Sequence, residues 1–280
     1  MNALLPPFAR RVLGRTAALC AIVAVSYLLV LRFPQPLFAH THAAGDFVLH
    51  SAVAIPDAVV ARVLEAATAL IRHSEFYDPR ERHMVFVTGA PWRHRLFNGP
   101  NTAGLARNSE IGERIFVPQL EPATAEVVHF DGRRAPAAPI LAHEVTHTYV
   151  RRQVGLLSSL RLPFWQREGY GEYIAFRDPA TLPARIRRLT TSSVPSAYVN
   201  AAGVSVPRPY YEAGVVWEYL LDVEGRSAAQ VLRGQSDARE VIARMTGWAD
   251  RQTDPRSGRG TARAPGAALP PDAHLQRDSR

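Results

Sequence analysis

The stretch His143-Glu144-Val145-Thr146-His147 carries the strongest structural signal in this 280-residue chain. Histidines four positions apart project from the same side of an α-helix, close enough to bind one metal ion. The glutamate after the first histidine can reach a water molecule bound to that metal. We therefore expect a helix here that carries a metal site, with zinc as the metal.

The flanking residues set the limits and the burial of this helix. Pro139 fits the first helical position, where its missing N–H leaves no helical hydrogen bond unmade. Val154-Gly155 marks the end, after two arginines whose charges suit the negative end of the helix dipole. The apolar residues and the histidines share two neighbouring stripes: Ile140, His143, His147 and Val150, and beside them Leu141, Val145 and Tyr149. We expect a mostly buried helix; the alternative is a surface helix that carries two histidines by chance.

A catalytic zinc site needs a third protein ligand and one open position for water. Pro163 predicts the start of a second helix, in which Glu168 and Glu172 lie one turn apart on the same face. We expect Glu168 to be the third zinc ligand. We expect Glu172 to accept the free N–H of a ligand histidine, which fixes the tautomer of that histidine. The alternative for Glu172 is a solvated residue on the outer face of the helix.

These two helices together resemble those of the gluzincin metallopeptidases. The HExxH pattern followed by W-x-x-E-G at 165–169 is most similar to the bacterial peptidase MA-like group. The resemblance implies that His143, His147 and Glu168 bind zinc. It also implies that Glu144 is the general base, which takes a proton from the zinc-bound water.

The resemblance extends over residues 45–235, and its specific part is confined to 139–176. Glu168 follows His147 by 21 positions, slightly more than in the gluzincin aminopeptidases. The sequence also lacks the Gly-x-Met-Glu-Asn stretch with which those enzymes hold a substrate amino terminus. An aminopeptidase activity is therefore not expected.

A third helix is predicted at 207–221, and its first turn carries two tyrosines. In the resembling families a tyrosine near this position can donate a hydrogen bond to the oxyanion of the tetrahedral intermediate. We expect Tyr211 to take this catalytic role, because it is spaced like a Tyr-x-x-Gly helix entry. Tyr210 is the alternative, and either ring could instead pack with its hydroxyl at the surface.

The amino-terminal segment predicts a membrane anchor. Residues 1–15 contain three arginines and no acid, and residues 16–31 form an uncharged apolar run that stops at Arg32 and Pro34. Sixteen residues lie at the short limit of a membrane span and at the long limit of a signal-peptide core. The sequence that follows is a poor cleavage site, which favours an uncleaved signal-anchor over 16–38; a cleaved signal peptide is the alternative.

Positive charge ahead of an apolar run keeps the amino end inside the cell. We therefore expect a basic, cytoplasmic segment at 1–15, a single pass through a bacterial inner membrane, and the remaining chain on the periplasmic or extracytoplasmic side. The only cysteine, Cys20, lies within the apolar run, so no disulfide can form within the chain.

The composition argues against one class of partner. The net charge of +8 comes from arginine, since the chain contains no lysine. The arginines are scattered or paired, and no basic run is interleaved with aromatic residues, so nucleic-acid binding is not expected. Residues 249–280 are rich in Pro, Gly, Ser, Arg and Asp with few large apolar side chains, which predicts a disordered tail.

Residues 45–248 are long enough for one domain with its own core. Strands are predicted at 46–51, 83–87 and 114–117, with a long helix at 56–74 after the first. These elements precede the helices of the zinc site. The expected fold is therefore α+β and zincin-like: a small twisted β-sheet, then a mainly helical half that carries the zinc site.

Other segments are expected to surround the site. In zincins an edge strand pairs with the extended substrate, and we expect the segment 111–118 to do so here. The loop-rich stretches 91–107 and 178–207 are expected to border the cleft. Five further histidines lack ligand-like spacing and are expected to lie at the surface or to have hydrogen-bond partners: His50, His73, His83, His94 and His129.

The sequence thus predicts a membrane-anchored, zinc-dependent metallopeptidase whose partners are a peptide or protein substrate and the membrane. Water activated by zinc would attack the peptide bond, with Glu144 as general base. The alternative is a membrane-tethered binding or assembly module that keeps a zincin fold, with a structural zinc or none.

Overall fold

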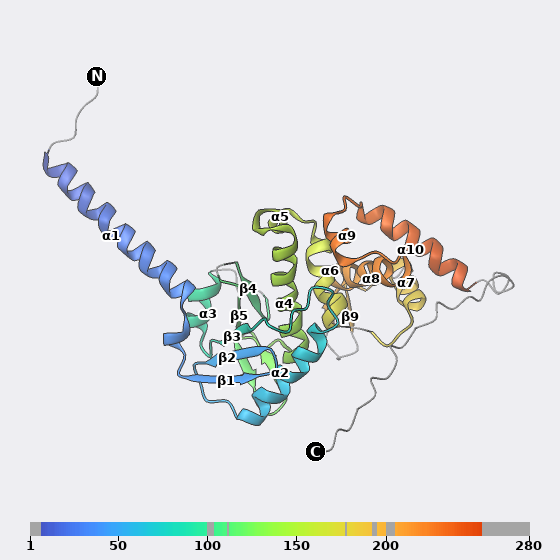
Figure 1. The fold of residues 1–280 in the computed structure, drawn as a ribbon, viewed down its shortest axis with the longest axis horizontal. Helices are drawn as coiled ribbons and strands as arrows, with labels where there is room; N and C mark the ends of the chain where they lie inside the picture. The colour runs from blue at the N-terminus through green and yellow to red at the C-terminus, as the bar shows by residue number, and fades with distance from the viewer. Residues whose placement is uncertain are drawn as a thin grey trace, which may run out of the picture.

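The computed structural model describes residues 7–99, 104–110, 112–176, 178–191, 195–199 and 205–253. The protein is a mixed α+β structure (Figure 1). A sheet half and a helical half lie side by side with helix α4 (Ala137–Val154) between them, and helix α1 (Pro7–Arg32) projects away from both.

The main sheet has five strands in the order β1-β2-β3-β5-β4. Their bounds are β1 His40–Ala44, β2 Phe47–Ser51, β3 His83–Val87, β4 Arg107–Ser109 and β5 Arg114–Val117. The central strands β2, β3 and β5 run parallel, whereas β1 and β4 are antiparallel strands at the two edges. Parallel strands are covered on both faces and read as apolar runs, which is why the segments 83–87 and 114–117 were predictable.

The hairpin between β1 and β2 depends on one glycine. Gly45 and Asp46 form the two-residue connection, and Gly45 has a φ of +54°, which glycine adopts without strain. A Cβ at Gly45 would clash with the Thr68 side chain on helix α2 (Asp57–Ile71). The Asp46 N–H donates to Thr68 Oγ1 at 3.0 Å, so the turn is fixed onto that helix.

The two faces of the sheet are covered differently. Helices α2 and α4 pack on one face over an aliphatic core that includes Leu64, Val85 and Val145. The opposite face carries an aromatic cluster of Phe38, Phe86, Phe97 and Phe116. Helix α3 (Pro91–Asn98) supplies Phe97, and the last residues of α1, Val30 and Leu31, pack against the same cluster.

A second, three-stranded antiparallel sheet leads into α4. Its strands are β6 Gln119–Glu121, β7 Glu126–Val128 and β8 Arg134–Pro136. Helix α4 begins at Ala137, so Pro139 is its third residue and not its first. It ends at Val154, before Gly155, as predicted.

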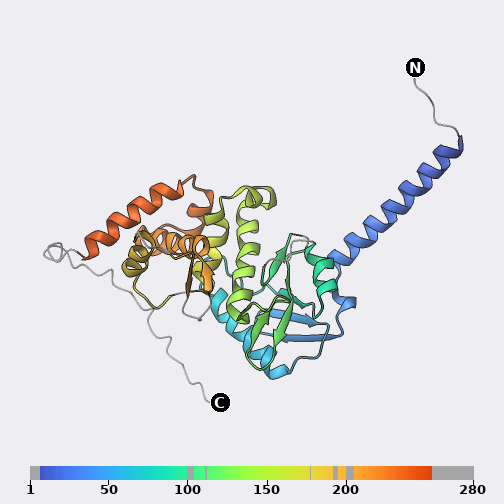
Figure 2. The same ribbon diagram turned by 180° about the vertical axis from the view of Figure 1, so that it is seen from behind.

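The helical half is built around α6, which packs between α4 and α8 (Figure 2). Trp217 of α8 is fully buried, with its ring centroid 4.8 Å from that of Tyr170 on α6. The elements of this half are α5 Leu156–Arg161, α6 Phe164–Ala175, α7 Leu182–Thr190, β9 Ala197–Val199, β10 Ser205–Pro207, α8 Arg208–Glu218 with a π-helical continuation Tyr219–Val223, α9 Ala228–Arg233 and α10 Ala238–Thr253.

The structure corrects the predicted edge strand and loops. The segment 111–118 was expected to form the sheet edge, but β5 within it lies between β3 and β4, and residue 111 is outside the described residues. The edge on this side is β4, a three-residue strand too short for a sequence pattern. The stretches 91–107 and 178–207 also contain regular structure, namely α3 and β4 in the first and α7, β9 and β10 in the second.

The predicted domain limits of 45 and 248 are too narrow. Phe38 and strand β1 belong to the domain at its start, and α10 continues to Thr253 with Ala249 buried at its end. Residues 249–253 of the predicted tail are therefore helical, and residues 254–280 lie outside the described residues. The sequence did not reveal this helix end because Ala249, its one buried side chain there, is too small to give a clear apolar pattern.

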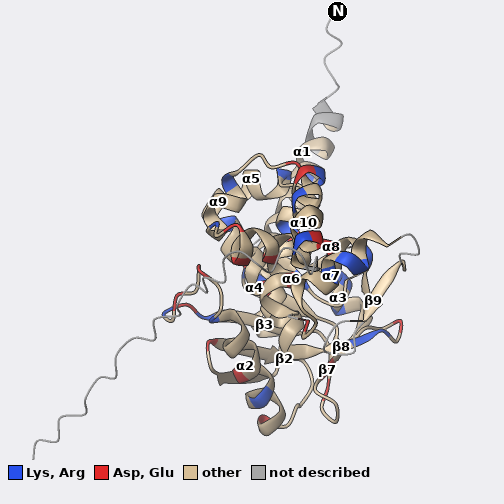
Figure 3. Ribbon diagram, turned by 90° about the vertical axis from the view of Figure 1, so that its right-hand side faces the viewer, with Lys and Arg blue, Asp and Glu red and all other residues tan. Residues whose placement is uncertain are grey.

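The amino-terminal helix is long and apolar enough over Val12–Arg32 to cross a membrane, and that window is not buried by the rest of the protein. It ends at Arg32, so the predicted anchor over 16–38 is six residues too long at its end. Phe38 instead packs in the domain, 5.0 Å from the ring centroid of Phe86. Figure 3 shows positive and negative residues dispersed over many elements of the described chain, without a single basic stripe.

Candidate metal centre

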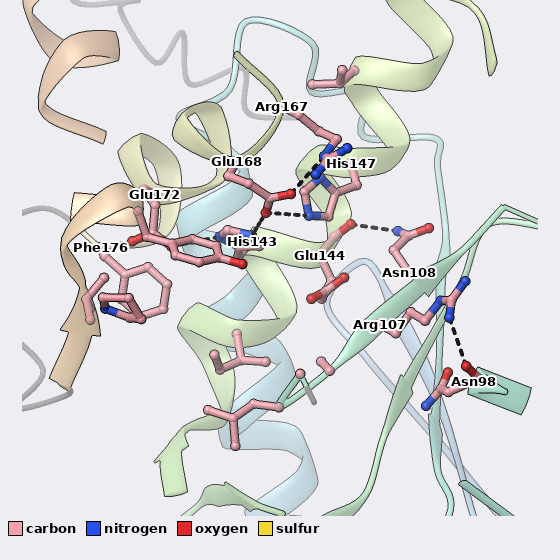
Figure 4. Close-up of a pocket in the computed structure, with 18 of the residues that line it drawn as sticks. Asn98, Arg107, Asn108, His143, Glu144, His147, Arg167, Glu168, Glu172 and Phe176 are labelled. Atoms are coloured by element: carbon pink, nitrogen blue, oxygen red, sulfur yellow. Dashed lines mark hydrogen bonds and ion pairs between the residues drawn. The ribbon is translucent and has the colours of Figure 1, made fainter. Parts of the chain in front are cut away.

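Helices α4 and α6 bring the side chains of the three predicted metal ligands close together (Figure 4). His143 Nε2 lies 3.4 Å from Glu168 Oε2, and His147 Nε2 lies 3.5 Å from the same oxygen. The two imidazole centroids are 5.0 Å apart. The four-residue spacing on α4 and the packing of α6 against it therefore direct two nitrogens and one oxygen toward a common position.

These separations fit a tetrahedral zinc ion. Zinc ligands at about 2.0–2.1 Å in tetrahedral geometry lie about 3.3–3.4 Å from one another. Both distances to Glu168 Oε2, 3.4 and 3.5 Å, are close to that spacing. Two imidazoles and one carboxylate also form a donor set known for catalytic zinc, with a fourth position left for water. His143, His147 and Glu168 could therefore hold the metal.

The charges around this position favour a cation. Burial alone would lower the pKa of His143, but the contacts with Glu168 and Glu172 raise it well above its usual value. Burial and the charge of His143 lower the pKa of His147 to about 3. Burial alone would raise the pKa of Glu168, but the two histidines and Arg167 lower it to about 2. The carboxylates thus stabilise positive charge between the two helices.

Glu144 belongs to the same cluster. Its carboxylate lies within 4.8 Å of the ligand atoms of His143 and His147. Burial raises the pKa of Glu144 to about 7, with the negative charge of Glu168 adding to the effect. A carboxylate whose pKa is near neutral can both accept and return a proton, which a general base with a later acid role requires.

The Glu172 carboxylate lies beside His143, one of the two predicted histidine ligands, either of which it was expected to orient. Its Oε1 lies 3.3 Å from His143 Nδ1, the ring nitrogen that faces away from Glu168. The contact has the distance of an ion pair, but its angle is not that of a hydrogen bond, and Nδ1 is otherwise without a hydrogen-bond partner. The hydrogen bond that would select the tautomer of His143 is therefore not made, and the Glu172 carboxylate acts on the ring through its charge.

Two glycines of α6 allow it to pack closely, Gly171 against His143 and Gly169 against α8. The sequence reasoning noted Gly169 only as part of the W-x-x-E-G pattern and gave neither glycine a packing role. A Cβ at Gly171 would lie 2.6 Å from His143 Nδ1, and a Cβ at Gly169 would lie 2.6 Å from the Ala213 carbonyl oxygen on α8. Helix interiors disfavour glycine by about 1 kcal/mol relative to alanine, so its presence needs a packing reason. The unusual E-G-x-G-E composition of α6 was the available signal.

Asn108 was also missed, and no sequence pattern pointed to it. This residue of β4 donates from Nδ2 to the Glu144 carbonyl oxygen at 2.6 Å and to Thr148 Oγ1 at 2.9 Å. Its Oδ1 accepts from Arg151. These bonds join the edge strand to α4 at Glu144.

The site opens into a cleft of about 970 Å³. Helix α8 contributes Tyr210, not Tyr211, to its lining. Burial, together with the negative charges of the nearby glutamates, raises the pKa of Tyr210 to about 12, so its hydroxyl keeps its proton. The Tyr211 hydroxyl donates instead to Asp178 Oδ2 at 3.1 Å, and its ring stacks on Tyr198. Adjacent helical residues point about 100° apart, so the packing of α8 decides which one faces the cleft.

The five histidines that lack ligand-like spacing are placed as expected. His73 is exposed. The remaining four are buried and have polar neighbours: His50 contacts Thr41, His83 contacts Tyr149, His94 contacts Asn98, and His129 contacts Asp131.

Comparison of the chain with protein-family models finds no match, and comparison with curated proteins finds none either.

Proposed function

We propose that this protein is a membrane-anchored, zinc-dependent metallopeptidase of the gluzincin type with a zincin-like fold. The observation that carries the proposal is the approach of His143 and His147 to one oxygen of Glu168, at 3.4 and 3.5 Å, with Glu144 beside the two histidines. The site lies in a cleft large enough for several residues of an extended peptide.

The bound zinc would supply a Lewis acid that acidifies a water molecule and polarises the scissile carbonyl. Glu144 accepts the proton of that water and later delivers it to the leaving amine. The charge of Glu172 beside Nδ1 favours the orientation of the His143 ring that exposes Nε2 to the cleft. Tyr210, which lines the cleft, would donate a hydrogen bond from its hydroxyl to the developing oxyanion.

The substrate would bind along strand β4. Arg107 and Asn108 of this strand line the cleft, and among the described residues β4 pairs only with β5. An extended polypeptide would add to the sheet along β4 through backbone hydrogen bonds, at Arg107 and Asn108. Since Asn108 is bonded to the Glu144 carbonyl, such a polypeptide would be fixed relative to the general base.

The apolar helix α1 would anchor the domain in a bacterial inner membrane. The arginines ahead of the apolar run favour a cytoplasmic amino end and an extracytoplasmic domain. Phe38 is buried in the domain, close after the helix, which supports retention of α1 over removal of a signal peptide.

The test uses the full-length protein in detergent, with measurement of zinc content and of cleavage of a peptide library. We expect about one zinc per chain and hydrolysis by the native protein. Glu144→Gln should retain zinc and lose activity by about 10²–10⁴-fold, the usual contribution of a general base. Glu65→Gln, an exposed glutamate of α2, is the matched control and should behave like the native protein.

Near-normal turnover by the Glu144→Gln variant would reject the mechanism. The alternative, a binding or assembly module with structural zinc or none, predicts no cleavage by any variant. Chelation separates the two further, because removal of a structural zinc unfolds the protein whereas removal of a catalytic zinc leaves it folded.

A further inference from the structure

We infer that helices α3 and α5 rest on the surface of the lipid bilayer that α1 crosses, and hold the domain against it. The docking face consists of the exposed side chains Trp92 and Arg95 on α3 and Leu156, Leu157 and Leu160 on α5. The inference depends on the proposed membrane anchor, and it is independent of any hydrolase activity.

The junction between α1 and the domain leaves no flexible spacer. The Tyr27 hydroxyl donates to the Leu96 carbonyl oxygen of α3 at 2.8 Å. Val30 and Leu31 pack against the aromatic cluster that includes Phe97. In Figure 1 and Figure 2, α3 accordingly lies beside the end of α1. The domain therefore touches the apolar helix along its last turn.

This contact sets the depth of α3. Tyr27 precedes Leu31, the last residue of the apolar run, by four residues, which is about 6 Å along a helix. Leu96 is therefore level with the last turn of the predicted span and not beyond it. Helices that lie in the interface of a bilayer sit at a similar depth, about 5–10 Å into the boundary between headgroups and acyl chains.

The composition of α3 suits that layer. Trp92 is 61% exposed and Arg95 is exposed, while His94 and Phe97 are buried on the opposite side. The helix contains two arginines and no acid. Tryptophan is enriched at the membrane interface, and arginine near the surface is attracted to anionic headgroups.

Helix α5 provides the second part of the docking face. Its leucines 156, 157 and 160 are 46%, 70% and 54% exposed, which is unusual for neighbouring leucines on a soluble surface. The helix contains Arg161 and no acid. Figure 1, Figure 2 and Figure 3 all show α5 on the side of the domain from which α1 leaves. A bilayer at the end of α1 would cover these leucines.

The cleft lies between the two docking elements. His94 and Asn98 of α3 and Ser159 and Leu160 of α5 all line it. A docked domain would therefore hold the cleft close to the lipid surface, within reach of polypeptide that emerges from or lies on the membrane.

The test places one fluorescent, environment-sensitive label at a time on the full-length chain in vesicles of phosphatidylcholine and phosphatidylglycerol that contain a spin-labelled quencher lipid. Cys20, the native cysteine, reports on the anchor. In a Cys20→Ser background, Trp92→Cys and Leu157→Cys report on α3 and α5. Val199→Cys is the matched control, because Val199 is 63% exposed and its strand β9 lies away from α1 in Figure 1.

We expect lipid quenching at 92 and 157 to exceed that at 199 several-fold, and Leu157→Glu to reduce the quenching at 92. Strong quenching at Cys20 with weak, equal quenching at 92, 157 and 199 would overturn the docking inference and leave the anchor intact. Weak quenching at Cys20 would overturn the anchor and the docking inference together. Peptide cleavage does not enter any of these readouts, so failure of the hydrolase proposal is measured separately.

Discussion

Two pairs of histidines lie close to the same cleft and have different neighbours; all but the half-buried His147 are buried. His143 and His147 on α4 have ring centroids 5.0 Å apart, and His94 and His129 have centroids 6.2 Å apart. His143 meets the carboxylates of Glu168 and Glu172. His94 instead meets the amide of Asn98, the hydroxyl of Thr88 and the ring of Phe130.

The neighbours determine the charge that each pair tolerates. Burial, with a contribution from His129, lowers the pKa of His94 to about 4. The carboxylates around His143 reverse the effect of burial and raise its pKa well above the usual value. The comparison teaches that burial of two histidines does not make a cation site. The α4 pair differs because one oxygen of Glu168, on a second helix, contacts both imidazoles, whereas the carboxylate near the other pair, Asp131, contacts His129.

The largest expected difference is in metal content. His147→Ala should lose the zinc and lower peptide hydrolysis by about 10²-fold or more. Loss of a zinc ligand should weaken zinc binding more than loss of a residue that only contacts a ligand. His94→Ala, the matched variant at the other pair, should keep about one zinc per chain. Elemental analysis of the two purified proteins checks this. Equal zinc in both variants would contradict the assignment of the site.

The next effect tests how closely α6 must approach α4. Gly171→Ala should weaken zinc affinity by about 10–100-fold, because the added methyl group displaces the His143 ring from its contact with Glu172. Gly247→Ala on α10 is the control, since a Cβ there meets only the flexible end of Arg251 at 3.6 Å. Competition with a zinc chelator measures both affinities. Native affinity in Gly171→Ala would show that the ring position is not critical.

A smaller effect is expected from the charge behind His143. Glu172→Gln keeps the size of the side chain and removes its negative charge, so zinc affinity should fall by about tenfold with little change in stability. Glu65→Gln should leave the affinity unchanged. The same chelator titration measures this, and thermal unfolding followed by circular dichroism checks the fold. A fall in melting temperature without a change in zinc affinity would assign Glu172 a structural role only.

The smallest effect concerns the other pair and the stability of the fold. The pKa of His94 is about 4 in the folded protein and higher when unfolded, so the unfolded state binds more protons between these values. The stability that the folded protein gains by keeping His94 neutral is fully present above the pKa of His94 in the unfolded state. It is lost as the pH falls toward about 4. After allowance for solvent screening, the loss from pH 7 to pH 5 should be on the order of 1–2 kcal/mol.

His94→Gln is the comparison for that measurement. Its free energy of unfolding in urea should fall less than that of the native protein between pH 7 and pH 5. Identical pH dependence of the two proteins would show that His94 is not held neutral by its surroundings.

Sequence patterns predicted those features that follow from the periodicity of a single helix or strand. The spacing of His143 and His147, the shared face of Glu168 and Glu172, and the apolar strands 83–87 and 114–117 all follow from helix and strand periodicity. Strand β4 and Asn108 did not, because three residues carry no period and their importance comes from pairing with β5 and α4. Strand β1 was missed for a related reason, since the half-buried positions of His40–Ala44 are two histidines and an alanine, which give no apolar pattern.

The sequence by itself determined which side chains could meet a metal ion, because residues four apart on a helix share a face wherever that helix lies. Only the tertiary structure decided that α6 approaches α4 closely enough for Glu168 to join them, that Tyr210 and not Tyr211 faces the cleft, and that β4 forms the edge of the sheet. Each of these depends on how one element packs against another. Such packing is fixed by the fit of many side chains distant in sequence, as at Gly171 and Trp217, and not by the periodicity of any one segment.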